Sequence, residues 1–209
     1  VIKGKDNAIR FAFLTGVTKL GKMSIFSGLN NLNDISMGAR YSDICGISEQ
    51  ELKAYFGESV KTLAEMNGLS EEECYKKLAS MYDGYHFCED SIGVYNPFSL
   101  LNTFNSGKFR MYWFETGTPT FLVRYLKQGN YNLDNISKND VAVETLTGAN
   151  YVSPAPITLM YQAGYLTIKD YDQRFNTYNL DYPNEEVKSG FLNSLSHLYA
   201  PALVGGELS

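Results

Sequence analysis

The spacing of apolar residues changes along the chain, and this change constrains the fold more than any other feature. Within residues 48–81 apolar side chains recur every three or four positions, which is the period of an amphipathic helix. Residues 165–171 are instead rich in β-branched and aromatic side chains, and residues 176–182 alternate after a short turn. The two patterns occupy separate parts of the chain, so they predict a mostly α fold with a small β part, the α+β class.

Local helix signals divide the middle of the chain into short helices. Two S-x-x-E capping boxes begin at Ser48 and Ser70, each just before an apolar stripe. Pro97 and Pro119 each stand at the first position of a further predicted helix, 97–104 and 119–126. We therefore expect a bundle of short helices here. A last helix is predicted from Asn184, which caps it, to about residue 199.

The first forty residues differ from the rest in charge. They hold six lysines or arginines and two aspartates, a balance of +4, although the whole chain has a net charge of −5. The acidic remainder disfavours bulk nucleic-acid binding, because the duplex is a dense polyanion. The basic end suits the phosphates of a small ligand, and a solvated edge with scattered lysines explains it equally well.

Cysteine and histidine usage excludes several site types. Cys45, Cys74 and Cys88 have no paired spacing, and only His86 and His197 accompany them, so we expect neither a disulfide framework nor a metal site. No apolar run approaches transmembrane length, and no signal peptide is recognisable, which predicts a cytoplasmic protein without membrane contact.

The apolar run IRFAFL at residues 9–14 predicts a buried strand. A partial phosphate-binding motif follows this run. Residues 16–22 match G-x-x-x-x-G-K. The next residue should carry a hydroxyl for magnesium, but it is Met23, whose thioether does not suit a hard cation, and Ser24 comes one position too late. No strand ending in an acidic residue follows, so we interpret the match as coincidental.

Five stretches resemble the AAA-ATPase-like family of bacterial proteins, and they follow one another in family order over nearly the whole chain. They are residues 13–36 (FLTGVTKLGKMSIFSGLNNLNDIS), 82–87 (YDGYHF), 94–104 (VYNPFSLLNTF), 161–172 (YQAGYLTIKDYD) and 182–187 (YPNEEV). Members usually have a P-loop near the N-terminus and often a PD-(D/E)XK nuclease-like domain at the C-terminus. The resemblance implies that both would lie outside this chain, before Val1 and after Ser209.

The resemblance also implies roles for individual residues. Thr15 matches the polar sensor at the end of a P-loop domain strand, and its hydroxyl would orient the attacking water or sense the γ-phosphate. Lys19 and Lys22 would approach phosphates as point charges. Apart from the resemblance, Arg124 on the predicted helix 119–126 is a candidate second sensor of the nucleotide. The alternatives are a strand-capping threonine, solvated lysines and a surface arginine. ATP and Mg²⁺ are then expected in the intact protein, and none bound tightly here.

The predicted architecture has three parts: a remnant of a P-loop core (1–40), a helical lid-like bundle (41–140) and a winged-helix-like unit with a β-hairpin (141–209). Residues 151–209 have a balance of −3, which makes specific DNA binding improbable. Asp83 and His86 are expected to have structural roles in a turn.

We expect a fragment of an AAA-type ATPase that is inactive alone and self-associates through its exposed strand. The alternative is a protein- or nucleic-acid-interaction module without nucleotide chemistry.

Overall fold

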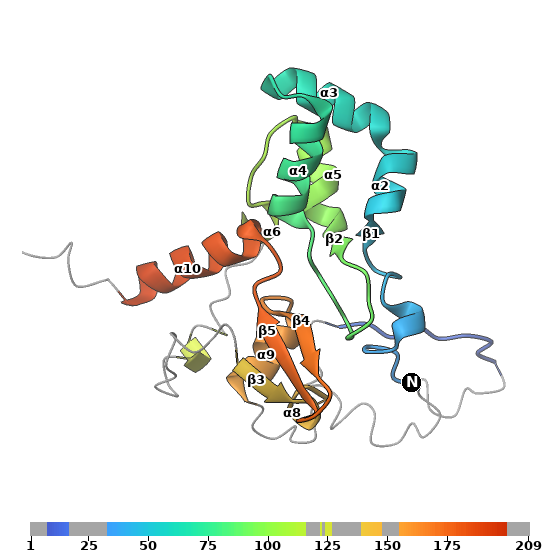
Figure 1. The fold of residues 1–209 in the computed structure, drawn as a ribbon, viewed down its shortest axis with the longest axis vertical. Helices are drawn as coiled ribbons and strands as arrows, with labels where there is room; N and C mark the ends of the chain where they lie inside the picture. Colours follow the sequence, from blue (N-terminus) through green and yellow to red (C-terminus); the bar gives the residue numbers. More distant parts are fainter. Residues whose placement is uncertain are drawn as a thin grey trace, which may run out of the picture.

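A computed structural model of the chain describes residues 8–16, 33–115, 122, 124–126, 139–147 and 155–199, and these form an α+β fold, as the sequence predicts. Figure 1 shows two parts, a helical bundle above and a small antiparallel sheet with its helices below. We call them the helical bundle and the sheet unit. The described helices include none that is long and apolar enough to cross a membrane.

The helical bundle is built from short helices, with a two-stranded antiparallel pair at its lower end in Figure 1. It consists of η2 (Ala39–Tyr41), β1 (Ile47–Ser48), α2 (Glu49–Tyr55), α3 (Gly57–Asn67), α4 (Glu71–Tyr82), β2 (Val94–Tyr95) and α5 (Pro97–Ser106). α6 (Tyr112–Glu115) follows and lies against the first turns of α10. These bounds confirm the predicted run of short helices.

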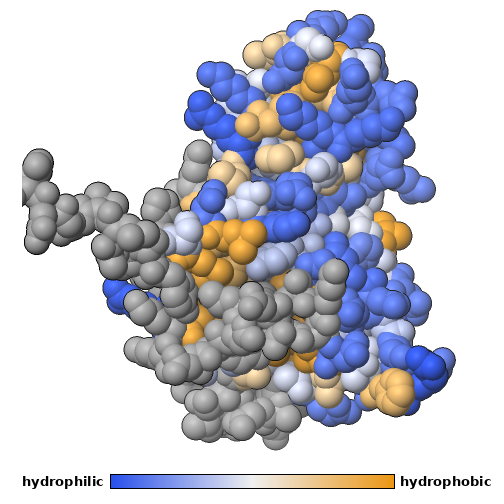
Figure 2. Space-filling view, turned by 60° about the vertical axis from the view of Figure 1, so that its left-hand side comes forward, coloured by the Kyte–Doolittle hydropathy of each residue, from blue (hydrophilic) through white to orange (hydrophobic). Residues whose placement is uncertain are grey.

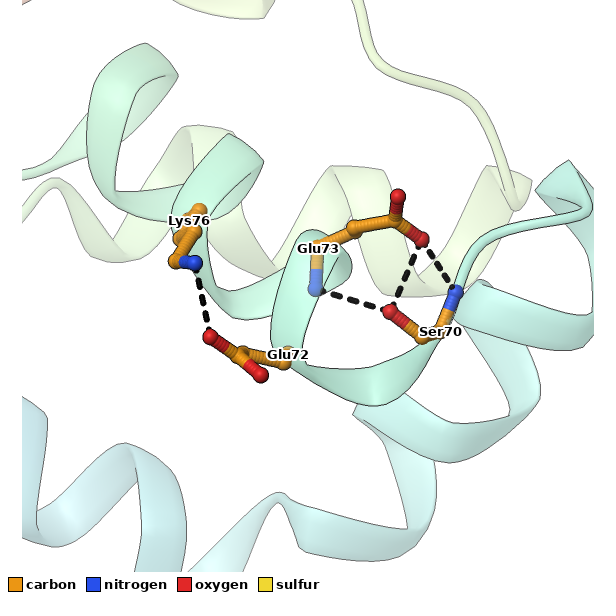
Figure 3. Close-up of polar contacts among 4 residues, drawn as sticks. All are labelled: Ser70, Glu72, Glu73 and Lys76. Carbon is orange, nitrogen blue, oxygen red and sulfur yellow. Dashed lines mark hydrogen bonds and ion pairs between the residues drawn. The ribbon is translucent and has the colours of Figure 1, made fainter.

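The capping boxes form as the sequence predicts. Figure 3 shows that the Ser70 hydroxyl accepts the backbone N–H of Glu73 (3.3 Å), while the Glu73 carboxylate accepts the backbone N–H of Ser70 (2.8 Å). The bond from the Ser70 backbone, with that from its hydroxyl, lowers the pKa of Glu73. Lys76 pairs with Glu72 one turn apart at 2.7 Å. Local chemistry therefore fixes where α4 begins.

The helical spacing of apolar residues produces the bundle core. Its fully buried members include Leu52, Val60, Leu78, Tyr82 and Leu100. The buried Tyr82 hydroxyl is satisfied, because it donates to the carbonyl of Arg110 at 2.9 Å.

The sheet unit has a three-stranded antiparallel sheet in the order β3-β5-β4. Its elements in chain order are β3 (Asn139–Ala142), α8 (Val143–Thr147), α9 (Pro156–Gln162), β4 (Thr167–Asp172), β5 (Thr177–Asp181) and α10 (Glu185–Tyr199). The β4–β5 hairpin and α10 were predicted. β3 and α8 were not, because five residues or fewer carry little periodicity.

The core of the sheet unit lies between the sheet, α9 and the first half of α10. α9 contributes four consecutive buried residues, from Ile157 to Met160, and α10 contributes Val187 and Phe191. A helix with buried side chains all round is an internal helix. α9 therefore serves as a packing element, which agrees with its apolar sequence.

The prediction of a buried strand at residues 9–14 is wrong for the described part of the chain. Residues 8–16 have no strand pairing with any other described segment, and the side chains of Phe11, Phe13 and Leu14 are 81%, 51% and 42% exposed. An apolar run becomes a strand only where neighbouring strands supply hydrogen-bond partners, and the described residues supply none for this one.

Candidate functional site

The residues predicted to contact a nucleotide are not brought together by the described structure. Thr15 is exposed in the unpaired segment, and Arg124 is exposed on a helical stretch whose Leu126 is buried. No described hydrogen bond or ion pair joins Thr15 to Arg124. Lys19 and Lys22 lie outside the described residues. Across the part of the chain that the structure describes, no group of three acidic, histidine or cysteine side chains is placed to hold a metal ion.

The structure brings other sequence motifs together instead, at the junction of the helical bundle and the sheet unit. In Figure 1 the chain descends from the end of α4, turns beside β4 and returns to β2. We call residues 83–89 of this descent the strap. The strap contains most of the YDGYHF stretch, and it contacts the stretches at 161–172 and 182–187. Motifs far apart in sequence thus meet at one place.

Side chains of the sheet unit hold the strap mainly by its backbone carbonyl groups. The donors come from α9, β4 and the cap of α10. The bonds are Asn184 Nδ2 to Asp83 O (2.9 Å), Lys169 Nζ to Gly84 O (3.5 Å), Thr167 Oγ1 to His86 O (2.9 Å) and Tyr161 Oη to Phe87 O (3.3 Å). The strap's own side chains take no part in these four bonds, although the Glu89 carboxylate accepts a further one from Tyr178 Oη at 2.7 Å.

Thr167 forms the tightest of these contacts. Its hydroxyl accepts the backbone N–H of His86 at 2.6 Å and donates to the carbonyl of the same residue at 2.9 Å. One side chain thereby satisfies both backbone groups of a residue, as a neighbouring strand would. Thr167 is only 2% exposed, so water does not compete for these bonds.

Gly84 lets the strap come close to the sheet unit. Its φ is +95°, and a Cβ at this position would lie 2.3 Å from the carbonyl oxygen of Pro183. The Lys169 ammonium donates to that same oxygen at 3.3 Å, beside its longer bond to Gly84. Burial lowers the pKa of Lys169, while nearby Asp181 and Asp83 act in the opposite direction. A residue with a side chain does not fit at position 84.

Asp83 and His86 lie close together within the strap. A Cβ at Gly93 would be 3.3 Å from both Asp83 Oδ1 and His86 Nε2, and His86 Nδ1 is 2.9 Å from the carbonyl oxygen of Ser91. Asp83 Oδ1 is buried without a hydrogen-bond partner among the described residues, and burial raises the pKa of this carboxyl. The structural roles expected of both residues remain predictions.

Aromatic residues form a second connection beside the strap. Trp113 and Phe114 of α6 pack on Tyr165, with ring centroids 5.0 and 5.9 Å away, and Tyr165 packs on Phe191 of α10 at 5.3 Å. The fully buried Glu186 accepts the backbone N–H of Trp113 at 2.9 Å. The helical bundle is therefore joined to the sheet unit at two neighbouring places.

Burial keeps the tyrosines of this region neutral. It raises the pKa of Tyr165 and Tyr182 to about 12, and it also raises the pKa of Tyr85 and Tyr161. Neutral phenols donate hydrogen bonds, as Tyr161 does to the strap, but they do not act as bases near pH 7.

An open groove borders the junction between the end of α4, residues 109–114 and α10. Its volume is about 730 Å³, its apolar lining includes Met81, Phe109 and Phe114, and polar Arg110 and Glu185 also line it. Figure 2 shows a hydrophobic area at mid-height on this side of the molecule, the level at which α6 and α10 lie in Figure 1. The groove contains no described catalytic constellation.

Sequence reasoning did not identify the residues that build the junction. Thr167, Lys169 and Asn184 were assigned to a strand or a helix cap, and Glu186 to a first helical turn. Their sequence context, two of the stretches on which the family resemblance rests, was the available indication. It did not show that these stretches meet residues 83–89.

Comparison with known proteins finds a longer relative. The chain is 42% identical over 207 residues to a protein of Azotobacter chroococcum mcd 1 described as an uncharacterized protein in the vnfD 5′ region. The match covers 96% of this chain but 37% of that protein, so the chain spans well under half the length of its relative. No protein-family model matches the chain. No solved structure matches it.

Proposed function

We propose that this chain supplies the sensor, lid and winged-helix parts of an AAA-type ATPase. Nucleotide hydrolysis then requires a P-loop core that the described residues do not contain. The support is the resemblance of five stretches to the AAA-ATPase-like family, together with a helical bundle followed by a small sheet unit. The relative from Azotobacter chroococcum is long enough to hold further domains, since the match covers 37% of it.

The exposed apolar segment at residues 9–14 carries this proposal. Phe11, Phe13 and Leu14 present their side chains to solvent, and the segment has no described strand neighbour. Burying one such side chain stabilises a protein by roughly 1.5–3 kcal/mol, and an unpaired strand readily joins another sheet edge. This favours a segment that completes the sheet of a P-loop core, with Thr15 at its end as the sensor.

The topology of the sheet unit supports the winged-helix part of the proposal. Two helices, α8 and α9, lie between β3 and β4, and β5 returns between those strands. A winged helix has the same order of elements, which supports the proposal that the β4–β5 hairpin is a wing. The second helix would read DNA in such a unit, but α9 is buried from Ile157 to Met160. We therefore propose a packing or coupling role for the unit, without specific DNA recognition.

Calorimetry with Mg-ATP tests the nucleotide part on the 209-residue chain. We expect no binding at micromolar concentrations, because Met23 stands where the partial motif needs a hydroxyl for magnesium. Micromolar binding that is lost in Lys22→Ala, or affinity gained in Met23→Ser, would show that the partial motif at residues 16–22 is a working P-loop.

A test of the sensor role needs the full-length protein that the encoding gene specifies. Its ATP hydrolysis should fall at least about tenfold in Thr15→Val, which corresponds to ~1.4 kcal/mol of transition-state stabilisation, and Thr15→Ser should restore it. Nucleotide binding should change little in either variant. If that protein neither binds nor hydrolyses ATP, the interaction-module alternative replaces the proposal.

A further inference from the structure

We infer that the helical bundle and the sheet unit form one rigid arm. The contact between the strap and Thr167 makes the two parts move together. The inference of rigidity rests on contacts within this chain. Its consequence is that the sheet unit moves together with the helical bundle when the bundle moves as a lid. This consequence rests on the proposed ATPase function. Two parts joined only by a linker would instead move independently.

Contacts on two sides of the junction oppose a hinge. The strap is held on the β4 side by Thr167, while α6 is held on the α10 side by Glu186 and the aromatic cluster around Tyr165. A hinge needs a few residues whose backbone dihedral angles change freely. Rotation about either attachment breaks the other, because the two attachments lie at different places on the sheet unit.

The backbone itself is held in the strap. The N–H and carbonyl of His86 are bonded to Thr167, and the N–H and carbonyl of Tyr85 pair with Val94, at 3.3 and 3.1 Å. The strap is therefore bonded to the bundle through β2 and to the sheet unit through β4 at adjacent residues. A change of dihedral angle at either residue costs hydrogen bonds at half-buried positions, two of them to the buried Thr167.

The contact with the strap also predicts which substitutions matter. The bonds reach the strap backbone, so removing the His86 side chain leaves them in place, whereas removing the Thr167 hydroxyl or the Tyr161 hydroxyl deletes them. The Gly84 approach to Pro183 keeps the two backbones close enough for these side chains to reach.

Distance measurement between spin labels tests the rigid arm. We would replace exposed Glu65 in the bundle and exposed Gln173 in the β4–β5 turn by cysteine, with the exposed Cys45 changed to serine. The unmodified junction should give one narrow distance. The double variant Thr167→Val/Tyr161→Phe should broaden the distribution at least about twofold.

A matched control separates the hydroxyl from the volume of the side chain. Thr167→Ser keeps the hydroxyl and should keep the narrow distance. A broad or bimodal distribution in the unmodified chain would overturn the inference, and so would an unchanged width in the double variant. If the double variant does not fold, the width of the distance distribution in the unmodified chain still tests the rigid arm. No nucleotide enters this measurement, so its outcome is independent of the ATPase assay.

Discussion

Replacing Gly84 by alanine should destabilise this protein more than the change Gly68→Ala, whose added Cβ meets open space. The backbone of Gly84 has φ +95°, which costs a residue with a Cβ roughly 1–2 kcal/mol. The new Cβ would also lie 2.3 Å from the carbonyl oxygen of Pro183. Overpacking of this kind typically costs ~1–3 kcal/mol, and a backbone oxygen has little freedom to move away.

The free energy of unfolding should therefore fall by about 1.5–4 kcal/mol. This figure allows for the ~0.4–1 kcal/mol that alanine contributes by restricting the unfolded chain. The matched control is Gly68→Ala at the end of α3. Its φ is +65°, but nothing lies within 4 Å of the added Cβ. We expect the control to lose only about 1 kcal/mol, since strain acts there without a clash.

Urea unfolding followed by two signals measures both variants. Trp113, the single tryptophan of the chain, lies at the junction and reports on it by fluorescence, while circular dichroism reports on all helices. The midpoint should shift further for Gly84→Ala than for Gly68→Ala at an unchanged slope. Equal losses in the two variants would refute the reasoning, because they would show that the contact with Pro183 contributes nothing.

Three further changes give distinct expectations. Gly190→Ala in α10 would place a Cβ 2.3 Å from the Phe114 ring and should destabilise by roughly 1–2 kcal/mol in thermal melts, whereas Gly57→Ala meets open space and should be neutral or stabilising. Ser70→Ala removes a helix cap and should cost about 1 kcal/mol in urea unfolding; no change would mean that the capping box contributes nothing. Burial raises the pKa of Asp83, so this carboxyl contributes stability below its unfolded pKa of about 3.9 and loses it as pH rises through the folded pKa. Asp83→Asn removes this titration, so between about pH 3.5 and 7 the melting temperature should fall less with rising pH than in the unmodified chain. An unaltered curve would contradict the raised pKa of Asp83.

Sequence alone determined the elements whose causes are local. The capping boxes at Ser48 and Ser70 begin α2 and α4, and Pro97 begins α5, because a cap or a proline acts on the backbone within one turn. The β4–β5 hairpin and α10 follow from strand-prone residues, a turn and the Asn184 cap in the same way. The α+β class follows from these elements.

Tertiary structure decided what depends on distant partners. β3 is four residues long and exists because β5 pairs with it, while the apolar run at residues 9–14 has no described partner and forms no strand. The junction is the clearest case, since Thr167 lies 81 positions from His86 and nothing near either residue announces the contact. Hydrogen bonds to a backbone leave no pattern in the sequence of the segment that receives them. Only the packing of the two parts could show that the strap connects them.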